Sequence, residues 1–195
     1  MSSSLPASST VPLSNNQALH TVPAEAYAPA FTVSPVTPGD YAEMGALHDA
    51  VFGPGALTRT AYRLREGMPY HSPFCRVTRK VGALVAMIRF TPITIGGTGN
   101  ALMLGPLAVA PACANQGHAR RLIAEGIDAA RLEGIRIVIL VGDRPYYGRL
   151  GFVLVSLGQI TMPGPVDPAR LLAFEISADA LASYRGLIAA DRAGR

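Results

Sequence analysis

The feature that most constrains the fold of this chain is a strand, loop, helix and strand pattern between Leu104 and Phe152. The segment LGPLAVAP, residues 104–111, has the composition of a strand, and apolar residues recur at helical spacing over about 116–133. Residues 135–141 are almost continuous Ile, Val and Leu, which is typical of a strand buried on both faces. A helix that joins two adjacent strands makes a right-handed parallel crossover. We therefore expect an α/β fold.

Further elements are expected on both sides of this unit. Residues 31–36 predict a first strand, and Thr37 before Pro38 predicts the start of a helix with Tyr41, Met44, Leu47 and Val51 on its buried face and His48 on its surface. The remaining predicted elements are a short helix over 58–66, strands over 74–78, 83–92, 102–109, 153–157 and 171–176, and turns near 79–80 and 96–100.

Length and composition predict one domain. Residues 1–30 are rich in Ser, Pro and Ala and lack Lys and Arg, so we expect a flexible tail followed by a domain over residues 31–195. The tail has neither the basic start of a secretory signal nor the arginines of a mitochondrial presequence. No apolar run approaches the ~18 residues that indicate a membrane span. We expect a chain that does not associate with membranes.

The net charge and the number of cysteines limit the classes of ligand and partner that the chain is expected to bind. The net charge of +4 suits a small anionic partner, but the arginines form no basic block with interleaved aromatic residues, so nucleic acid is not expected. Cys75 and Cys113 are too few for a disulfide framework or a metal site. A reducing cytoplasm fits this usage.

The loop NQGHA, residues 115–119, precedes the central helix and carries the first candidate site. Backbone amides at a helix N-terminus can hold a polyphosphate, and the small residues Gly117 and Ala119 let an anion approach the main chain. The Lys-Ser/Thr of a nucleotide P-loop and the pattern GxGxxG are both missing, which argues against ATP and NAD. A tight strand-to-helix turn without a ligand is the alternative interpretation.

Together with a downstream motif, this loop resembles the GNAT superfamily of acyl-CoA-dependent N-acetyltransferases. The family pattern Gln/Arg-x-x-Gly-x-Gly/Ala falls on residues 114–119, with Ala114 where a polar residue is usual, and Tyr-x-x-x-Gly-Phe falls on Tyr147, Gly151 and Phe152. The segments LGPLAV and YYGRLGF resemble a branch of small bacterial members. The resemblance covers about residues 31–188. It implies a mixed, mostly antiparallel twisted sheet, flanked by helices, whose central strands 4 and 5 splay apart.

The resemblance also implies a site. Acetyl-CoA would be the cosubstrate, with no metal, and its pantetheine arm would bond to strand 4 in the gap between the splayed strands. A backbone amide near Leu107 would polarise the thioester carbonyl, and Tyr147 would protonate the departing thiolate, with Tyr146 as a packing residue. His118 is either a phosphate donor or an exposed residue at the helix start. The implied cofactor-binding residues are Leu107, Ala108, Val109, Asn115, Gln116, Gly117, His118, Ala119 and Arg120.

The general base and the acceptor stay open. Asp143 is the nearest candidate base, although a turn or helix cap is the favoured interpretation, and Glu66, Tyr70 and His71 lie in the acceptor-side region of the family fold. An acceptor pocket is expected around Arg59, Tyr62, Arg63, Tyr70 and Met162. The resemblance implies direct transfer of an acetyl group to an unidentified primary amine, on a small molecule or a protein, and leaves a homodimer open. The rival is a non-catalytic acyl-CoA-binding module or sensor, motivated by Ala114 and the missing base.

Overall fold

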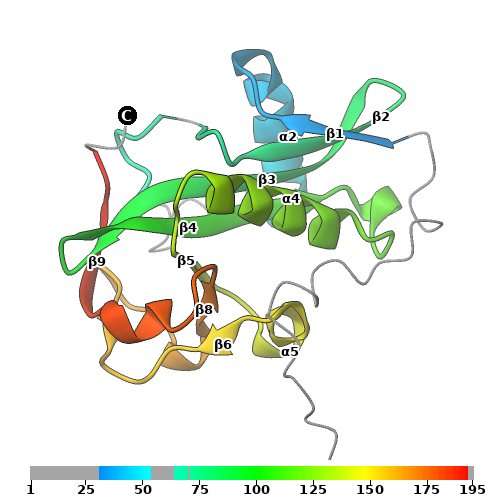
Figure 1. The fold of residues 1–195 in the computed structure, drawn as a ribbon. Coiled ribbons are helices and arrows are strands. Elements are labelled where there is room, and N and C mark those ends of the chain that lie inside the picture. The colour runs from blue at the N-terminus through cyan, green and yellow to red at the C-terminus, as the bar shows by residue number, and fades with distance from the viewer. Residues whose placement is uncertain (1–30, 54–63, 70, 193–195) are drawn as a thin grey trace, which may run out of the picture.

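A computed structural model describes residues 31–53, 64–69 and 71–192, and a long antiparallel hairpin forms its centre (Figure 1). The hairpin consists of β3 (Ala83–Ile95) and β4 (Thr98–Val109). Its turn is Gly96–Gly97 alone, shorter than predicted, because φ values of 56° and 84° let two glycines reverse the chain. The predicted tail and most of the predicted helix over 58–66 lie outside the described residues, and residues 64–67 form a turn.

The N-terminal elements extend this hairpin. β1 (Phe31–Pro35) pairs with β2 (Arg76–Lys80), and β2 pairs with β3. The predicted position of β2 was two residues too early, because the chain turns at Val81 and Gly82, with φ values of 47° and 84°. A short 3-10 turn, η2 (Pro38–Asp40), leads into α2 (Tyr41–Phe52).

The start of α2 follows the predicted cap. The Asp40 carboxylate accepts hydrogen bonds from the Thr37 amide at 2.7 Å and from the Thr37 hydroxyl at 2.8 Å. The prediction for His48 was wrong, because its side chain lies on the buried face of α2 with its ring 5.2 Å from that of Phe52. Helical spacing places His48 one turn after Met44, on the same face.

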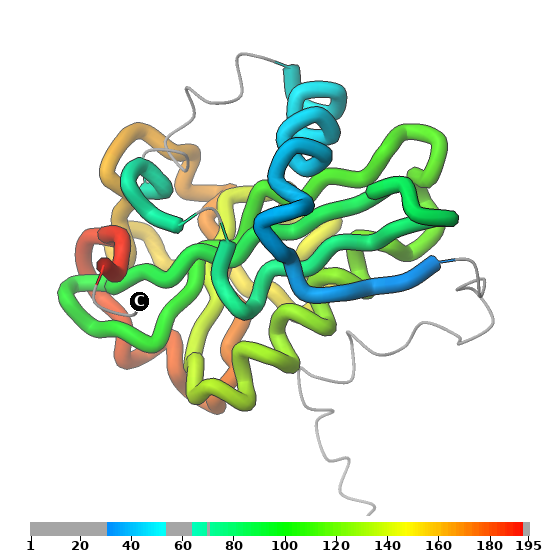
Figure 2. Tube along the Cα trace, turned by 90° about the horizontal axis from the view of Figure 1, so that it is seen from above, coloured from blue at the N-terminus to red at the C-terminus, as the bar shows by residue number. Residues whose placement is uncertain are grey.

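Two helices cover opposite faces of β3 (Figure 2). The helix α4 (His118–Leu132) packs on the face that contains Ile88 and Phe90, whereas α2 packs on the face that contains Met87. Successive strand residues point to opposite faces, so one strand supplies both cores. Gly126 brings α4 close to the sheet, because a Cβ on this residue would overlap the Phe90 ring.

The predicted parallel crossover is confirmed. β4 continues through the short η4 (Pro111–Cys113) and α4 into β5 (Ile137–Val141), which runs parallel to β4. The helix starts two residues later than predicted, because Asn115 and Gly117 have φ values of 61° and 82°, outside the helical region. It ends at Leu132, one residue earlier than predicted, with Glu133 as the C-cap before Gly134.

The C-terminal part completes a mixed, mostly antiparallel sheet in the order β1-β2-β3-β4-β5, then β8 (Leu171–Glu175) and β6 (Val153–Leu154), with β9 (Gly186–Ala190) paired to β3 and to β7 (Ile160–Thr161). The predicted fold class is therefore confirmed, although β6 is shorter than predicted and α5 (Arg144–Tyr147), β7 and β9 were not predicted. Within the described residues, no helix is long and apolar enough to cross a membrane. The remaining C-terminal elements are η5 (Gly148–Leu150), η6 (Pro168–Arg170) and η7 (Ala180–Ser183).

The strands β4 and β5 separate, as predicted. Their pairing begins at Ala101 with Ile137 and ends at Met103 with Ile139, whereas β4 continues along β3 to Val109. A β-bulge lies at the point of separation, because Gly105 and Pro106 together oppose one residue of β3. The bulge bends β4 away from β5 and opens one end of the sheet.

Candidate active site

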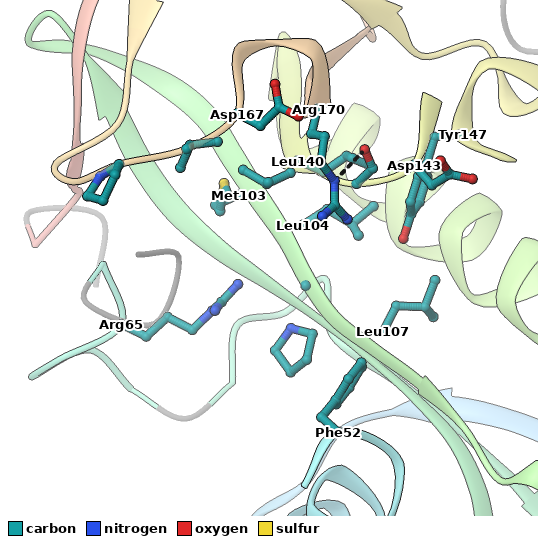
Figure 3. Close-up of a pocket in the computed structure, with 16 residues that line it drawn as sticks. Phe52, Arg65, Met103, Leu104, Leu107, Leu140, Asp143, Tyr147, Asp167 and Arg170 are labelled. Carbon is teal, nitrogen blue, oxygen red and sulfur yellow. Dashed lines mark hydrogen bonds between the residues drawn. The ribbon is translucent and has the colours of Figure 1, made fainter. Parts of the chain in front are cut away.

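A groove with a volume of about 770 Å³ occupies the space between the separating strands (Figure 3). One wall is β4 and the other is the end of β5 with the segment that follows it. The end of α2, the turn at residues 64–67 and the loop before β8 close the remaining sides. The groove is lined by Phe52, Arg65, Met103, Leu104, Gly105, Pro106, Leu107, Leu140, Val141, Gly142, Asp143, Tyr147, Pro165, Val166, Asp167 and Arg170.

The main chain of β4 presents alternate residues to this groove. The Ala110 amide donates to the Val85 carbonyl of β3 at 2.8 Å, which fixes the phase of the antiparallel ladder. Because the direction of backbone groups alternates along a strand, the Ala108 amide also points toward β3, while the amides of Leu107 and Val109 point to the open edge of β4. Of these residues, Leu107 lines the groove. Two of the three predicted β4 residues therefore offer main-chain groups to a ligand at this edge, and Ala108 lies between them.

The predicted phosphate loop forms the N-terminus of α4. The first bond of the helix runs from the Arg121 amide to the Gly117 carbonyl at 3.0 Å, so the amides of Ala119 and Arg120 come before the helical ladder. Nothing lies within 4 Å of the position that a Cβ of Gly117 would take. The Gln116 side chain is directed back to the Ala112 carbonyl at 3.3 Å. The loop is open to an anion and surrounded by positive main-chain dipoles.

His118 lies at the first position of α4 with its ring directed into the protein. The residue is 1% exposed, and the ring packs edge-on against Phe31 with centroids 4.5 Å apart. Burial, with a smaller effect from the charge of Lys80, lowers the pKa of His118. The expectation of an exposed His118 was wrong, and what this residue can offer a phosphate is its main-chain amide.

Tyr147 lies in α5 on the β5 side of the groove. Its ring packs against Phe152 with centroids 5.6 Å apart and against Gly142, where a Cβ would overlap it. Burial raises the pKa of Tyr147 to about 12, with a smaller contribution from Tyr146. The phenol therefore keeps its proton at neutral pH and can donate it. Tyr146 is 43% exposed and packs edge-on against Tyr147.

The residues predicted as candidate general bases do not lie together around the Tyr147 hydroxyl. Asp143 is exposed at the residue before α5, and in Figure 3 its carboxylate points away from the middle of the groove. Glu66 is exposed, and His71 contacts the hydroxyl of Tyr41 through its Nδ1 atom. Met162 lies in a second cavity of about 380 Å³. Arg59, Tyr62, Arg63 and Tyr70 lie outside the described residues.

Sequence reasoning missed two arginines of the groove. Arg65 comes from the turn at residues 64–67 and Arg170 from the end of η6, just before β8, and in Figure 3 their guanidinium groups point into the groove from opposite sides. Neither belongs to a motif, so no local signal could have found them. Elsewhere in the described part of the chain, no three His, Cys, Asp or Glu side chains are grouped as metal ligands.

Comparisons with known proteins agree with this geometry. The model of the Acetyltransferase (GNAT) family matches residues 42–152. The Escherichia coli K12 protein described as uncharacterized N-acetyltransferase YhbS is 29% identical over 108 residues, which are 55% of this chain and 65% of that protein. The chain thus matches somewhat less than two thirds of that relative's length.

Two solved structures are similar over more of the chain. The structure of the Escherichia coli GNAT family N-acetyltransferase YhbS in complex with CoA has a TM-score of 0.73 and 25% identity, and the match covers 83% of this chain and 90% of that one. A GNAT family acetyltransferase from Brucella melitensis in complex with acetyl-CoA has a TM-score of 0.56 and 30% identity, over 74% of this chain and 95% of that one.

Proposed function

Because the chain belongs to the GNAT acetyltransferase family, we propose that it transfers the acetyl group of acetyl-CoA to a primary amine. The observation that carries this proposal is the groove between β4 and β5, where β4 main-chain groups and the protonated phenol of Tyr147 face one cavity. The relatives solved with CoA and with acetyl-CoA support the choice of cosubstrate.

The cosubstrate would lie along β4 with its phosphates at α4. The pantetheine arm adds to the open edge of β4 as an extra strand, through the main chain of Leu107 and Val109. The pyrophosphate is held by main-chain amides of residues 115–120, so the methyl side chain of the exposed Ala114 is no obstacle. Arg120 lies in the first turn of α4 and adds a positive charge beside the loop. Its charge also acts on the phenol of Tyr146.

Transfer would proceed by direct attack. A free alkylammonium has a pKa near ~10.4, so the acceptor must lose a proton, which passes to water, before its nitrogen attacks the thioester carbon. The amide near Leu107 stabilises the oxyanion that forms. The C–S bond then breaks, and the Tyr147 phenol protonates the departing thiolate. The nitrogen, which became positively charged on attack, loses its second proton to water, and water returns a proton to Tyr147. The products are the N-acetylated amine and CoA.

A non-catalytic acyl-CoA-binding module is the second candidate. Ala114 favours it, because this residue replaces the usual polar residue of the family pattern. The position of the carboxylates also favours it: neither Asp143 nor Asp167 points to the middle of the groove in Figure 3, so neither is placed to act as a general base. Calorimetric titration with acetyl-CoA, followed by measurement of thiol release with a panel of amines, separates the two. The enzyme binds acetyl-CoA and releases thiol with at least one amine, whereas the module only binds. Lack of binding would exclude both.

The phosphate site has a matched test at Gly117. Gly117→Asp and Gly117→Asn both place a side chain at a φ of 82°, so they share the backbone strain and differ mainly in charge. We expect Gly117→Asp to weaken acetyl-CoA binding at least about tenfold more than Gly117→Asn, because a carboxylate repels the phosphates. Equal affinities in the two folded variants would move the phosphates to another place.

A further inference from the structure

We propose that the acceptor is a small primary amine that also carries a carboxylate or phosphate group, and that Arg65 and Arg170 hold this anionic group. The inference rests on the proposed acetyl transfer and names the substrate class of the same groove. It follows from the position of the two guanidinium groups, from the charges around them and from the place already taken by the cosubstrate.

Arg65 reaches the bulge of β4. The residue is 8% exposed, and its Nη2 atom lies 3.5 Å from the position that a Cβ of Gly105 would take. Gly105 has a φ of 119°, which disfavours any residue with a side chain and keeps this approach open. Arginine is rarely buried so far. The cation therefore lies within the groove, at the point where β4 leaves β5.

Arg170 approaches from the opposite wall. Its Nε atom lies 3.5 Å from the Gly142 carbonyl, and the Gly142 amide donates to the Arg170 carbonyl at 2.9 Å, which fixes the main chain at this position. In Figure 3 the guanidinium points into the groove on the side of Tyr147, and its charge acts on the phenol of Tyr147. Two forked donors thus face one space, as recognition of carboxylate or phosphate requires.

Two acidic residues, Asp143 and Asp167, belong to the described lining of the groove, and neither carboxylate points to its middle. The Asp167 carboxylate accepts a hydrogen bond from the Ala169 amide at 2.9 Å, and in Figure 3 it points away from the groove, as does that of Asp143. The groove lining also includes the apolar residues Phe52 and Pro165. The groove therefore presents two cationic side chains to an acceptor, and the whole groove has the size of a small-molecule site.

The phosphates of the cosubstrate are not the anions that these arginines would bind. The phosphate loop lies at the N-terminus of α4, beyond the Val109 end of β4, whereas both arginines face the section of the groove around Gly105. A cosubstrate laid along β4 from α4 would bring its thioester toward that section. The amine of an acceptor anchored there would approach the thioester carbon, next to Tyr147.

The test uses two matched pairs of amines with the full chain and acetyl-CoA. γ-Aminobutyrate is compared with n-butylamine, and phosphoethanolamine with ethanolamine, by the kcat/KM of thiol release. We expect the anionic member of at least one pair to be preferred by about tenfold or more, and the pair that shows the preference distinguishes carboxylate from phosphate. Equal values within both pairs would overturn the inference and leave the acetyl transfer intact.

Variants of the two arginines test whether Arg65 and Arg170 cause the preference for an anionic amine. Arg170→Gln and Arg65→Gln should raise KM for the preferred anionic amine about 10- to 100-fold, the effect of a lost charged hydrogen bond, without changing acetyl-CoA affinity. The KM of the uncharged amine should rise much less, so the preference within the pair should fall. Arg144→Gln, at an exposed arginine of α5, is the control. If Arg65→Gln fails to fold, Arg65→Lys keeps the charge without the fork and should still raise KM.

Two results separate this inference from the proposed function. If acetyl-CoA binds but no amine is acetylated, the same amines are titrated into the CoA complex, and the anionic members should bind at least tenfold more tightly; if they do not, the inference is overturned. A loss of acetyl-CoA affinity in both arginine variants would also overturn it, because the arginines would then hold the cosubstrate. Lack of acetyl-CoA binding by the unmodified chain would instead remove the proposed function.

Discussion

Tyr147 combines a buried ring with a phenol at the groove, and this environment determines its chemistry. Burial raises its pKa to about 12, so the neutral form persists at every pH below that value. We expect Tyr147→Phe to lower kcat by ~10²-fold or more and to leave acetyl-CoA affinity unchanged, because only the proton donor is lost. In the unmodified chain, titration of Tyr147 should cause no fall of kcat on the alkaline side until the pH nears that pKa.

Tyr146 supplies the control for this measurement. It is the more exposed of the two rings and does not line the groove, so Tyr146→Phe should cost much less activity. The comparison is kcat for both variants across pH. Similar small losses would make Tyr147 a packing residue, and a large loss confined to Tyr146→Phe would show that the proton donor is its neighbour.

Gly142 is a positioning residue for that phenol. A Cβ on Gly142 would overlap the Tyr147 ring, whereas nothing lies within 4 Å of a Cβ on Gly148. We expect Gly142→Ala to lower kcat about tenfold or more while Gly148→Ala stays close to the unmodified chain. In a Tyr147→Phe background, Gly142→Ala should reduce kcat little further, because the group it displaces no longer donates a proton. Full additivity would contradict the positioning role.

The sequence predicted those site residues that belong to short motifs, and it missed those that come together only in the folded chain. Tyr147 and Gly117 belong to short motifs whose spacing is readable along the chain. Arg65 and Arg170 line the same groove only because the turn at residues 64–67 and the end of η6 pack around it, and no local sequence pattern indicates this. The burial of His118 has the same origin, since it depends on Phe31 of β1.

At the scale of elements, β4 has two edges with different partners. Its Ala108 amide points toward β3, while those of Leu107 and Val109 point to the opposite, open edge of the strand. If pantetheine adds to that edge, CoA should slow hydrogen exchange of the Leu107 and Val109 amides and leave Ala108 little changed. Amide exchange followed by NMR, with and without CoA, measures this alternation. Uniform protection of all three residues would argue against an added strand.

The sequence predicted the types of the helices and strands more accurately than the residues at which they begin and end. The apolar stripe of α4 and the continuous apolar run of β5 were predicted in the correct order, because both patterns arise from burial of the element itself. Errors arose where backbone conformation decides, as at Asn115 and Val81, whose positive φ values no apolar pattern announces. The four-residue α5 is too short to show a period.

At the scale of the whole molecule, the C-terminal segment returns to the central hairpin. The Gly96 amide donates to the Leu187 carbonyl at 2.9 Å, and β9 pairs with β3. The hydroxyl of the buried Tyr184 donates to the Gly99 carbonyl at 2.7 Å. The sequence did not predict β9, because five residues, GLIAA, lack alternation and owe their strand to β3.

Because the C-terminal segment packs against the hairpin turn, substitutions of Gly96 and Gly97 should lower the thermal stability of the protein by different amounts. Gly96→Ala and Gly97→Ala share the strain of a positive φ, which costs about 1–2 kcal/mol. A Cβ on Gly96 would also overlap the main-chain oxygen of Arg185, whereas nothing lies within 4 Å of a Cβ on Gly97. We expect Gly97→Ala to lower Tm by roughly 2–8 °C and Gly96→Ala by at least twice as much. Equal shifts in thermal melts would show that the C-terminal segment yields to the new methyl group.

If acetyl-CoA binds between β4 and β5, the short ladder between these strands would connect cosubstrate binding to the stability of the protein. Strands on the two sides of the groove meet only from Ala101 to Met103, so a molecule seated between them would tie the early and late parts of the chain together. A ligand present at ~100 times its Kd adds about 2.7 kcal/mol to the free energy of unfolding. The protein without its cosubstrate would then open more often to proteases than the bound form does.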